Sequence, residues 1–241
     1  MDSWFEKIPT DYKLPTDLEK ELYETGFVVL PGTIANSDFP SLSAAYDLAV
    51  SNAEPDDVHI GSTSIRVVDF VNRGPEFDGL YTCGPLLAAC CSVIRQPFKL
   101  SSFHARTLKP YSIAQTIHTD IKQDDGWPLI GFIVMIDEFR PENGATRFVP
   151  GSHLRTDAIK GPSVDSTTVP ACGPAGSMII YNGSAWHGHG ANTTSRPRRS
   201  IQGAFIRRDL ESAVNWANQI TADTQNRIGN LAKYLLDVQG R

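Results

Sequence analysis

The feature that most constrains the fold is a series of short apolar segments, each followed by a turn signal. They span residues 98–108, 129–136, 145–149, 178–181 and 200–206. Asn-Gly or Pro-Gly pairs stand at 143–144, 150–151 and 182–183, and the Asn143-Gly144 pair predicts a tight turn with positive φ at both residues. Short strands at such intervals are typical of a β-sandwich or jelly roll. We therefore predict a mainly β fold.

Helical patterns flank these segments. Residues 16–25 begin with a capping pattern and end at Gly26, a second helix is expected from Asn36 through Leu48, and residues 86–94 are apolar nearly all round. Residues 27–30, which precede Pro31-Gly32, and residues 65–71 are expected to form further strands. Residues 209–238 predict an amphipathic helix, broken near 221–223. A chain of 241 residues fits a single domain, 1–241, with a C-terminal helical segment at about 209–238.

Composition and charge exclude several classes of function. The formal net charge is −5 with no long basic run, which argues against nucleic acid as a partner. No leader pattern is visible at the N-terminus and no apolar run approaches the length of a membrane span, so we expect no membrane association. The four cysteines have neither zinc nor redox spacing, and buried free thiols in a reducing compartment, the cytoplasm, are expected. The chain is expected to be a monomer or homodimer.

Residues 115–120 carry the chemistry. Side chains repeat every second residue on a strand, so His118 and Asp120 share one face, with Gln115 on the other unless the strand bends. An imidazole and a carboxylate, completed by a distant histidine, make the facial triad of a non-haem Fe(II) oxygenase. The candidate third ligand is His187, but His189 has the offset that shares its face, and periodicity alone does not choose between them.

Three further polar residues have less specific settings. Arg66 lies in an otherwise apolar segment, which an anion contact or a surface position would both explain. His104 belongs to no motif and is interpreted as a histidine with satisfied hydrogen bonds. His59 lies in a polar stretch, residues 52–61, that predicts a mobile loop, and it is interpreted as solvated.

Three motifs together resemble the phytanoyl-CoA dioxygenase family. They are residues 118–120 (HTD), residues 142–153 (ENGATRFVPGSH) and residues 186–192 (WHGHGAN), the last followed by RPRR at 196–199. The motifs occur in the family's order and at near-family spacing, and the likeness covers the chain from Gly26 to Ile206. The resemblance implies a double-stranded β-helix, a jelly roll of the cupin-like type. It also implies an enzyme that uses Fe(II), 2-oxoglutarate and O2 to oxidise a C–H bond, forming succinate and CO2.

The resemblance also implies the roles of site residues. It implies His118, Asp120 and His187 as catalytic metal ligands, His187 being favoured over His189 by the family pattern. Arg198 stands where the family places the arginine that binds the distal carboxylate of 2-oxoglutarate, and an arginine can grip a carboxylate bidentately. Further candidates for contacts with the cosubstrate are Gln115, Thr146, His189 and Arg66. Arg199 is expected to point outward or support the turn, and His153 to form structural hydrogen bonds.

A small-molecule substrate is expected in a largely apolar pocket. The candidate lining residues are Phe103, Ile117, Trp127, Phe132 and Trp186, and the loops 52–64 and 121–127 are expected to select the substrate. The pattern predicts a small, mainly apolar or aromatic metabolite and not a CoA thioester, whose phosphates would need a basic surface. The alternative function is a non-oxidative cupin-like metal-binding protein or a metal-dependent hydrolase that uses the same ligands.

Overall fold

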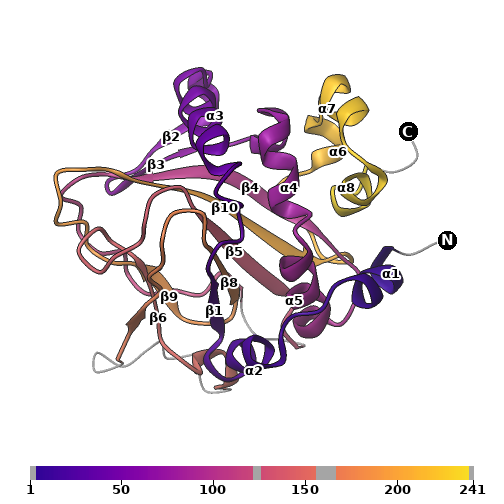
Figure 1. Ribbon diagram of the computed structural model, residues 1–241, viewed down its shortest axis with the longest axis horizontal. Coiled ribbons are helices and arrows are strands. Elements are labelled where there is room, and N and C mark those ends of the chain that lie inside the picture. Colours follow the sequence, from indigo (N-terminus) through magenta and orange to yellow (C-terminus); the bar gives the residue numbers. More distant parts are fainter. Residues whose placement is uncertain (1–3, 122–125, 156–166, 239–241) are drawn as a thin grey trace.

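The computed structural model describes residues 4–121, 126–155 and 167–238, and two antiparallel sheets form its centre (Figure 1). The seven-stranded sheet has the order β1 (Phe27–Leu30), β8 (Met178–Asn182), β5 (Leu129–Met135), β10 (Arg198–Arg207), β4 (Phe98–Leu108), β3 (Ser64–Val67) and β2 (Val58–Ile60). The three-stranded sheet has the order β7 (Val169–Pro170), β6 (Thr146–Phe148) and β9 (His187–His189). This is the jelly roll that the spacing of the apolar segments predicts.

The two faces of the large sheet have different roles. One face carries Phe103, Phe132 and Phe205, which are at most 1% exposed and belong to the larger core. The opposite face carries Ile133, Ile179 and the ring of Tyr181 and packs, in part, against Phe148 of the small sheet. Side chains alternate between faces along each strand, so one sheet can cover a core on one side and border a cavity on the other.

Helices cover the first of these faces and one end of the molecule. They are α1 (Trp4–Asp11), α2 (Thr16–Thr25), α3 (Phe39–Ser51), α4 (Asp78–Tyr81) and α5 (Gly84–Ile94), with 3-10 turns at Pro55–Asp57, Phe70–Asn72, Pro75–Phe77 and Ser152–Leu154. The helices expected at 16–25, 36–48 and 86–94 correspond to α2, α3 and α5, whereas the sequence did not indicate α1. Gly26, at φ 89°, ends α2 and donates its N–H to Leu22 O.

The C-terminal segment differs from the single helix that its apolar period predicts. It folds as α6 (Trp216–Gln219), α7 (Ala222–Arg227) and α8 (Asn230–Leu235), which lie together at the end of the molecule near α1 (Figure 1). Thr221 Oγ1 accepts a hydrogen bond from Thr224 N and so caps α7, while Gly229 separates α7 from α8. The apolar positions are nevertheless the buried ones, as Ile228, Ala232 and Leu235 show.

Three other local predictions are corrected. The strand expected at 65–71 ends at Val67, because Asp69 adopts φ 64° and turns the chain into a 3-10 turn. The stretch expected as a loop at 52–61 contains β2, which pairs with β3 and carries His59. At the Asn143-Gly144 turn only Gly144 has positive φ, because Asn143 uses its side chain to bridge Glu138 O and Arg140 N.

The segment Pro75–Ile94 is long and apolar enough to cross a membrane by length and composition, contrary to the expectation that no run approaches such a length. In the fold it is a 3-10 turn followed by α4 and α5, and Leu86, Leu87 and Cys90 of α5 are fully buried in the core. The packing accounts for its hydropathy. All four cysteines are free; Cys90 is buried as expected, but Cys172 is exposed.

Candidate active site

Three potential metal ligands meet at one point between the two sheets. His118 Nε2 lies 3.8 Å and His187 Nε2 lies 3.7 Å from Asp120 Oδ1, and the ligand atoms of all three residues lie within 4.8 Å of one another. His187 belongs to β9, whereas residues 115–120 form an extended segment and not the strand that their alternation predicts. Two backbone hydrogen bonds between His118 and His187, of 2.9 and 2.8 Å, fix the pair side by side.

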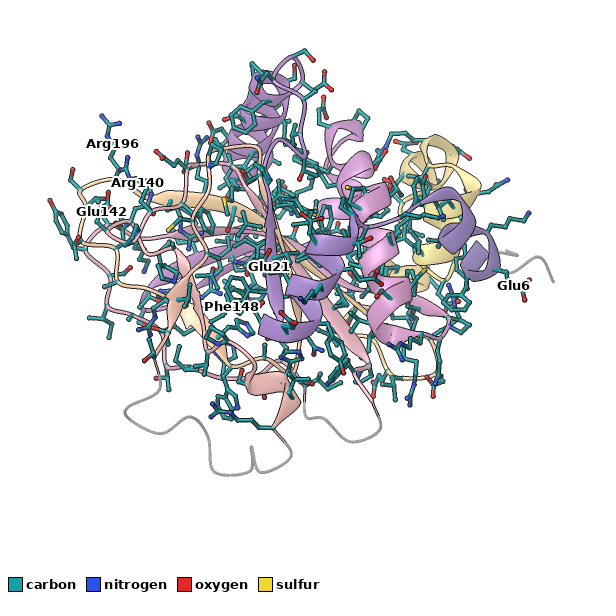
Figure 2. The ribbon with its side chains drawn as sticks, turned by 60° about the horizontal axis from the view of Figure 1, so that its bottom comes forward. Glu6, Glu21, Arg140, Glu142, Phe148 and Arg196 are labelled. Atoms are coloured by element: carbon teal, nitrogen blue, oxygen red, sulfur yellow. The ribbon has the colours of Figure 1, made fainter. Side chains whose placement is uncertain are left out.

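The hydrogen bonds of both rings orient them for metal binding. His118 Nδ1 lies 3.1 Å from Thr116 O, and His187 Nδ1 lies 2.9 Å from Ala185 O. A carbonyl oxygen only accepts, so each Nδ1 carries the proton and each Nε2 keeps its lone pair, directed at Asp120. Burial lowers the pKa of His187, which favours the neutral, metal-binding imidazole. Phe148, inside the molecule between the sheets (Figure 2), stacks against that ring at 5.5 Å.

Tyr181 on β8 positions the carboxylate, a role that the sequence did not reveal. Its hydroxyl donates a 2.8 Å hydrogen bond to Asp120 Oδ2, which leaves Oδ1 toward the two imidazoles. Burial and the charge of Asp120 raise the pKa of Tyr181 well above its ordinary value, so the phenol stays a donor. The ring crosses β5 at Gly131, its partner in the register, where a Cβ would lie 2.1 Å from Tyr181 Cζ. An isolated glycine in an apolar strand was the available signal.

A cavity of about 280 Å3 opens beside the triad, and it is lined by most of the residues expected to contact a cosubstrate. Its lining residues include Gln115, Thr146, His189 and Arg66. Gln115 thus lies on the same side as the triad, which means that the segment 115–120 bends. His189 Nε2 lies 3.1 Å from Thr63 Oγ1, so its ring is directed to the β2–β3 hairpin and away from the meeting point of the triad. His187, not His189, joins His118 and Asp120 in the metal-capable group.

Arg198, the first residue of β10, is a buried cation without a counter-ion among the described residues. It is 1% exposed, its guanidinium lies 3.9 Å over the Phe139 ring, and Nη2 donates to Gly144 O at 3.2 Å. Nε and Nη1 have no hydrogen-bond partner in the described part of the chain. Burial, followed by the charge of Arg106, lowers the pKa of Arg198 to about 9, and an arginine nonetheless stays charged at neutral pH.

Arg198 is not itself among the lining residues and lies just beyond one end of the cavity. Gly144, its acceptor, precedes the lining residue Thr146 by two positions, and the charge of Arg198 contributes to the lowered pKa of His189. A carboxylate that enters this end could accept hydrogen bonds from this guanidinium. The neighbouring Arg199 forms ion pairs with Asp47 of α3 and with Asp137, on the helix-covered face of the sheet.

None of the five aromatic and apolar residues that the sequence predicts as lining borders the cavity. Phe103 and Phe132 belong to the core on the helix-covered face, and neither borders the cavity. Trp127 packs against Tyr23 and His153 at the surface, with ring centroids 5.6 and 5.3 Å away. Neither Trp127, the half-buried Trp186 nor Ile117 is among the residues that line the cavity. Residues 122–125 of the loop expected over the metal lie outside the described residues.

Polar residues of the large sheet line the cavity instead. Arg66 of β3, Arg106 and His104 of β4, and Gln202 of β10 all border it. The interpretation of His104 as satisfied is wrong, because its Nε2 is buried and has no hydrogen-bond partner in the described part of the chain. His153, in contrast, makes the expected structural contact, with Nε2 2.9 Å from Tyr23 O.

A jelly roll that directs two imidazoles and one carboxylate to a point beside a cavity defines the class of proteins with a two-histidine, one-carboxylate metal site. Residues 23–200, well over half of the chain, match the model of the phytanoyl-CoA dioxygenase (PhyH) family. The chain belongs to this family.

Relatives and solved structures agree with that placement. A segment of 108 residues is 39% identical to the dioxygenase trt7 of Aspergillus terreus and covers 41% of this chain and 37% of that protein, so the match spans little more than a third of the relative. The multifunctional dioxygenase prhA of Penicillium brasilianum is 29% identical over a match that covers 78% of this chain and 70% of the prhA chain. The structure of the epimerase SnoN with Fe3+, alpha-ketoglutarate and nogalamycin RO has the same fold, with a TM-score of 0.69 at 19% identity and coverage of 79% and 82%.

Proposed function

We propose that the protein is an Fe(II)- and 2-oxoglutarate-dependent dioxygenase that oxidises a C–H bond of a small molecule, hydroxylation being the reaction expected first. One observation carries the proposal: two imidazoles and a carboxylate meet at a cavity, and near it lies a buried arginine two of whose nitrogens have no hydrogen-bond partner in the described part of the chain. A metal chelated by a keto acid needs both features, because one end of the cosubstrate occupies the metal and the other needs a fixed cation.

The residues present fit the proposed cofactors. His118, Asp120 and His187 would hold the metal, and three coordination positions would remain for ligands that are not protein. Arg198 would bind the distal carboxylate of 2-oxoglutarate. The cavity between the triad and Arg198 is lined by further candidates for contacts with the cosubstrate, Thr146, His189, Arg66 and Gln115. When bound, iron and the keto acid supply the oxidising chemistry with O2, and the protein's part is to bind and orient.

Each of the chain's own groups has a defined task in this proposal. Tyr181 holds Asp120 so that a single oxygen faces the metal position. The carbonyls of Thr116 and Ala185 fix the tautomers of the two histidines. The lining residues hold the substrate carbon near the triad. The epimerase SnoN shares the fold, so this fold is compatible with outcomes other than hydroxylation.

The test is whether 2-oxoglutarate, and not succinate, stabilises the Fe(II) protein in the absence of oxygen. Only the keto acid can chelate a metal while its other carboxylate reaches Arg198, so a rise in the melting temperature with 2-oxoglutarate alone is expected. Equal effects of the two acids, or no effect of either, would favour the non-oxidative cupin-like protein or hydrolase. If 2-oxoglutarate alone stabilises the protein, screening metabolites for those that trigger succinate release would identify the substrate.

Cytoplasmic localisation and a monomeric or homodimeric state are parts of the same proposal. The four free cysteines and the formal net charge of −5 support a reducing compartment and argue against nucleic acid as a partner.

A further inference from the structure

A row of polar side chains crosses the cavity wall on three neighbouring strands. Arg66 of β3 lies directly opposite Arg106 of β4, and His104 of β4 lies directly opposite Gln202 of β10. All four border the cavity that the triad also borders. Because they occupy alternate positions on the same face, the four side chains form one contiguous polar surface.

Arg106 is the central cation of this surface and lacks an anionic partner. Its Nε donates to Ser64 Oγ at 3.2 Å and its Nη2 to Gln115 Oε1 at 3.5 Å, both neutral acceptors. It forms no ion pair with a carboxylate in the described part of the chain. Asp120 is near enough to favour its charged form, but one oxygen of Asp120 is held by Tyr181 and the other faces the histidines.

This arrangement of charges destabilises the folded protein unless an anion binds to Arg106. Two arginines directly opposite on adjacent strands repel each other, and burial together with Arg66 lowers the pKa of Arg106. A desolvated cation with only neutral partners is destabilising, whereas the same cation with a bidentate carboxylate is not. The geometry is therefore that of a site prepared for an anion.

His104 and Gln202 supply further hydrogen bonds at the same place. His104 Nε2 is buried and has no hydrogen-bond partner among the described residues, and burial together with Arg66 and Arg106 lowers the pKa of His104 to about 3, so its ring is neutral at physiological pH. The side chain of Gln202 has no hydrogen-bond partner among the residues that the structure describes. A neutral imidazole and an amide can each donate one hydrogen bond to an oxygen of a ligand.

The cosubstrate does not account for this surface. In the proposed function one carboxylate of 2-oxoglutarate binds the metal and the other binds Arg198. Neither carboxylate is then available to Arg106, His104 and Gln202, which can bind a group of the substrate. We infer that the substrate carries a carboxylate, which Arg106 binds with help from His104 and Gln202 while the carbon to be oxidised lies at the triad. This inference rests on the proposed function and replaces the apolar metabolite that the sequence predicts.

The rest of the lining agrees with a small organic acid. Beyond Gln202 the cavity is bordered by the small side chains of Ala204, Ser102 and Ala213 and by the apolar Leu129 and Ile133. A volume of about 280 Å3 is at the low end for a ligand site and leaves no room for a large cofactor-linked substrate inside. The apolar part of the acid would lie against these residues.

The test compares carboxylic acids with their primary amides, using phenylacetic, cyclohexanecarboxylic and octanoic acid as probes. Binding to the anaerobic Fe(II)–2-oxoglutarate protein is measured by the change in its visible absorption and by its melting temperature. At least one acid should bind about tenfold more tightly than its amide, and this preference should fall to less than about threefold in Arg106→Gln. Gln202→Leu, which leaves Arg106 in place, should lower the affinity for the acid without abolishing its preference over the amide.

The matched control is Arg140→Gln, which removes the same charge from the exposed end of the molecule (Figure 2), where Arg140 pairs with Glu138 and Glu142. It should keep the preference of the unaltered protein. The inference is overturned if no acid is preferred over its amide, or if Arg106→Gln keeps the preference but raises the 2-oxoglutarate requirement about tenfold. Failure of the unaltered protein to show any 2-oxoglutarate-dependent absorption would instead contradict the proposed function, and the inference with it.

Discussion

Replacing Gly131 by alanine should damage the metal site from the neighbouring strand. The Tyr181 ring lies across Gly131, and a Cβ there would stand 2.1 Å from Cζ and 2.4 Å from the hydroxyl oxygen. Tyr181 is only 8% exposed and packs against Phe148 and His187, so the ring cannot move aside freely. The substitution must therefore displace the hydroxyl from its 2.8 Å contact with Asp120 Oδ2.

The size of the effect follows from the two interactions lost. Overpacking a buried position costs about 1–3 kcal/mol of stability, and a hydrogen bond to a charged group contributes about 1.5–3 kcal/mol. A group that orients a metal ligand typically contributes about 10- to 100-fold to metal affinity, equivalent to about 1.4–2.8 kcal/mol. We expect Gly131→Ala to lose both stability and affinity. Tyr181→Phe, which removes only the hydroxyl, should lose affinity by a similar factor.

Gly203→Ala is the matched control. Gly203 borders the cavity through its backbone, but its Cβ would point to the helix-covered face and meet Phe132 Cζ at 2.4 Å, a comparable conflict with an aromatic ring from the adjacent strand. Anaerobic titration with Fe(II) and urea denaturation should show that both alanine variants are destabilised and that only Gly131→Ala loses metal affinity. Equal metal affinity in the two variants, or unchanged affinity in Tyr181→Phe, would refute the role assigned to Tyr181.

Four further outcomes are expected. Alanine at any of the three metal ligands should abolish Fe(II)-dependent succinate formation, whereas His189→Ala should still bind one equivalent of Fe(II). Loss of Fe(II) binding in His189→Ala together with full activity in His187→Ala would exchange the roles of the two histidines. Arg198→Lys should raise the 2-oxoglutarate requirement at least about tenfold, because a point charge replaces a planar fork, and an unchanged value in a succinate assay would move the anchor elsewhere. The free energy of unfolding in urea should fall as the pH drops from 6.5 toward about 3, because unfolded His104 then binds a proton that the folded protein excludes; His104→Gln should show a smaller fall, and an identical pH profile would contradict the shift. In competition assays of succinate release, CoA-free acids should be turned over and acyl-CoA thioesters should not; turnover of the thioesters alone would restore the activity for which the family is named.

Local patterns in the sequence were sufficient for several elements and for the pairing of His118 with Asp120, whereas the choice of His187 came from the family resemblance. Capping residues and Gly26 delimit α2 at Thr16–Thr25, and the apolar run before Pro31 delimits β1 at Phe27–Leu30, as the sequence predicts. His118 and Asp120 meet although their segment is not a strand, because an extended backbone places alternate side chains together whether or not it is paired.

The sequence did not contain the strand register, which decides which residues of β4 border the cavity. On β4, strict alternation from Phe103 would place Phe98 and Leu100 on the opposite face, beside His104. All three instead lie in the same core, at most 1% exposed, because the pairing with β10 shifts between Ala204 and Phe205 and leaves one extra residue on β4. The aromatic residues of β4 were therefore available to the core, and the polar ones to the cavity.

The same irregularity closes the cavity, which ties the fold to the proposed specificity. Ser101 is the extra residue: its Oγ accepts a hydrogen bond from Ala213 N and its carbonyl accepts one from Val214 N, both 2.9 Å. These bonds hold the segment after β10 across the end of the sheet, where Ala213 borders the cavity opposite small side chains. A β-bulge that re-aims side chains beside an active site is a known device of barrels. Here it turns Phe98 and Leu100 into the core and leaves a short, polar-walled space, in which we propose that a small acid binds.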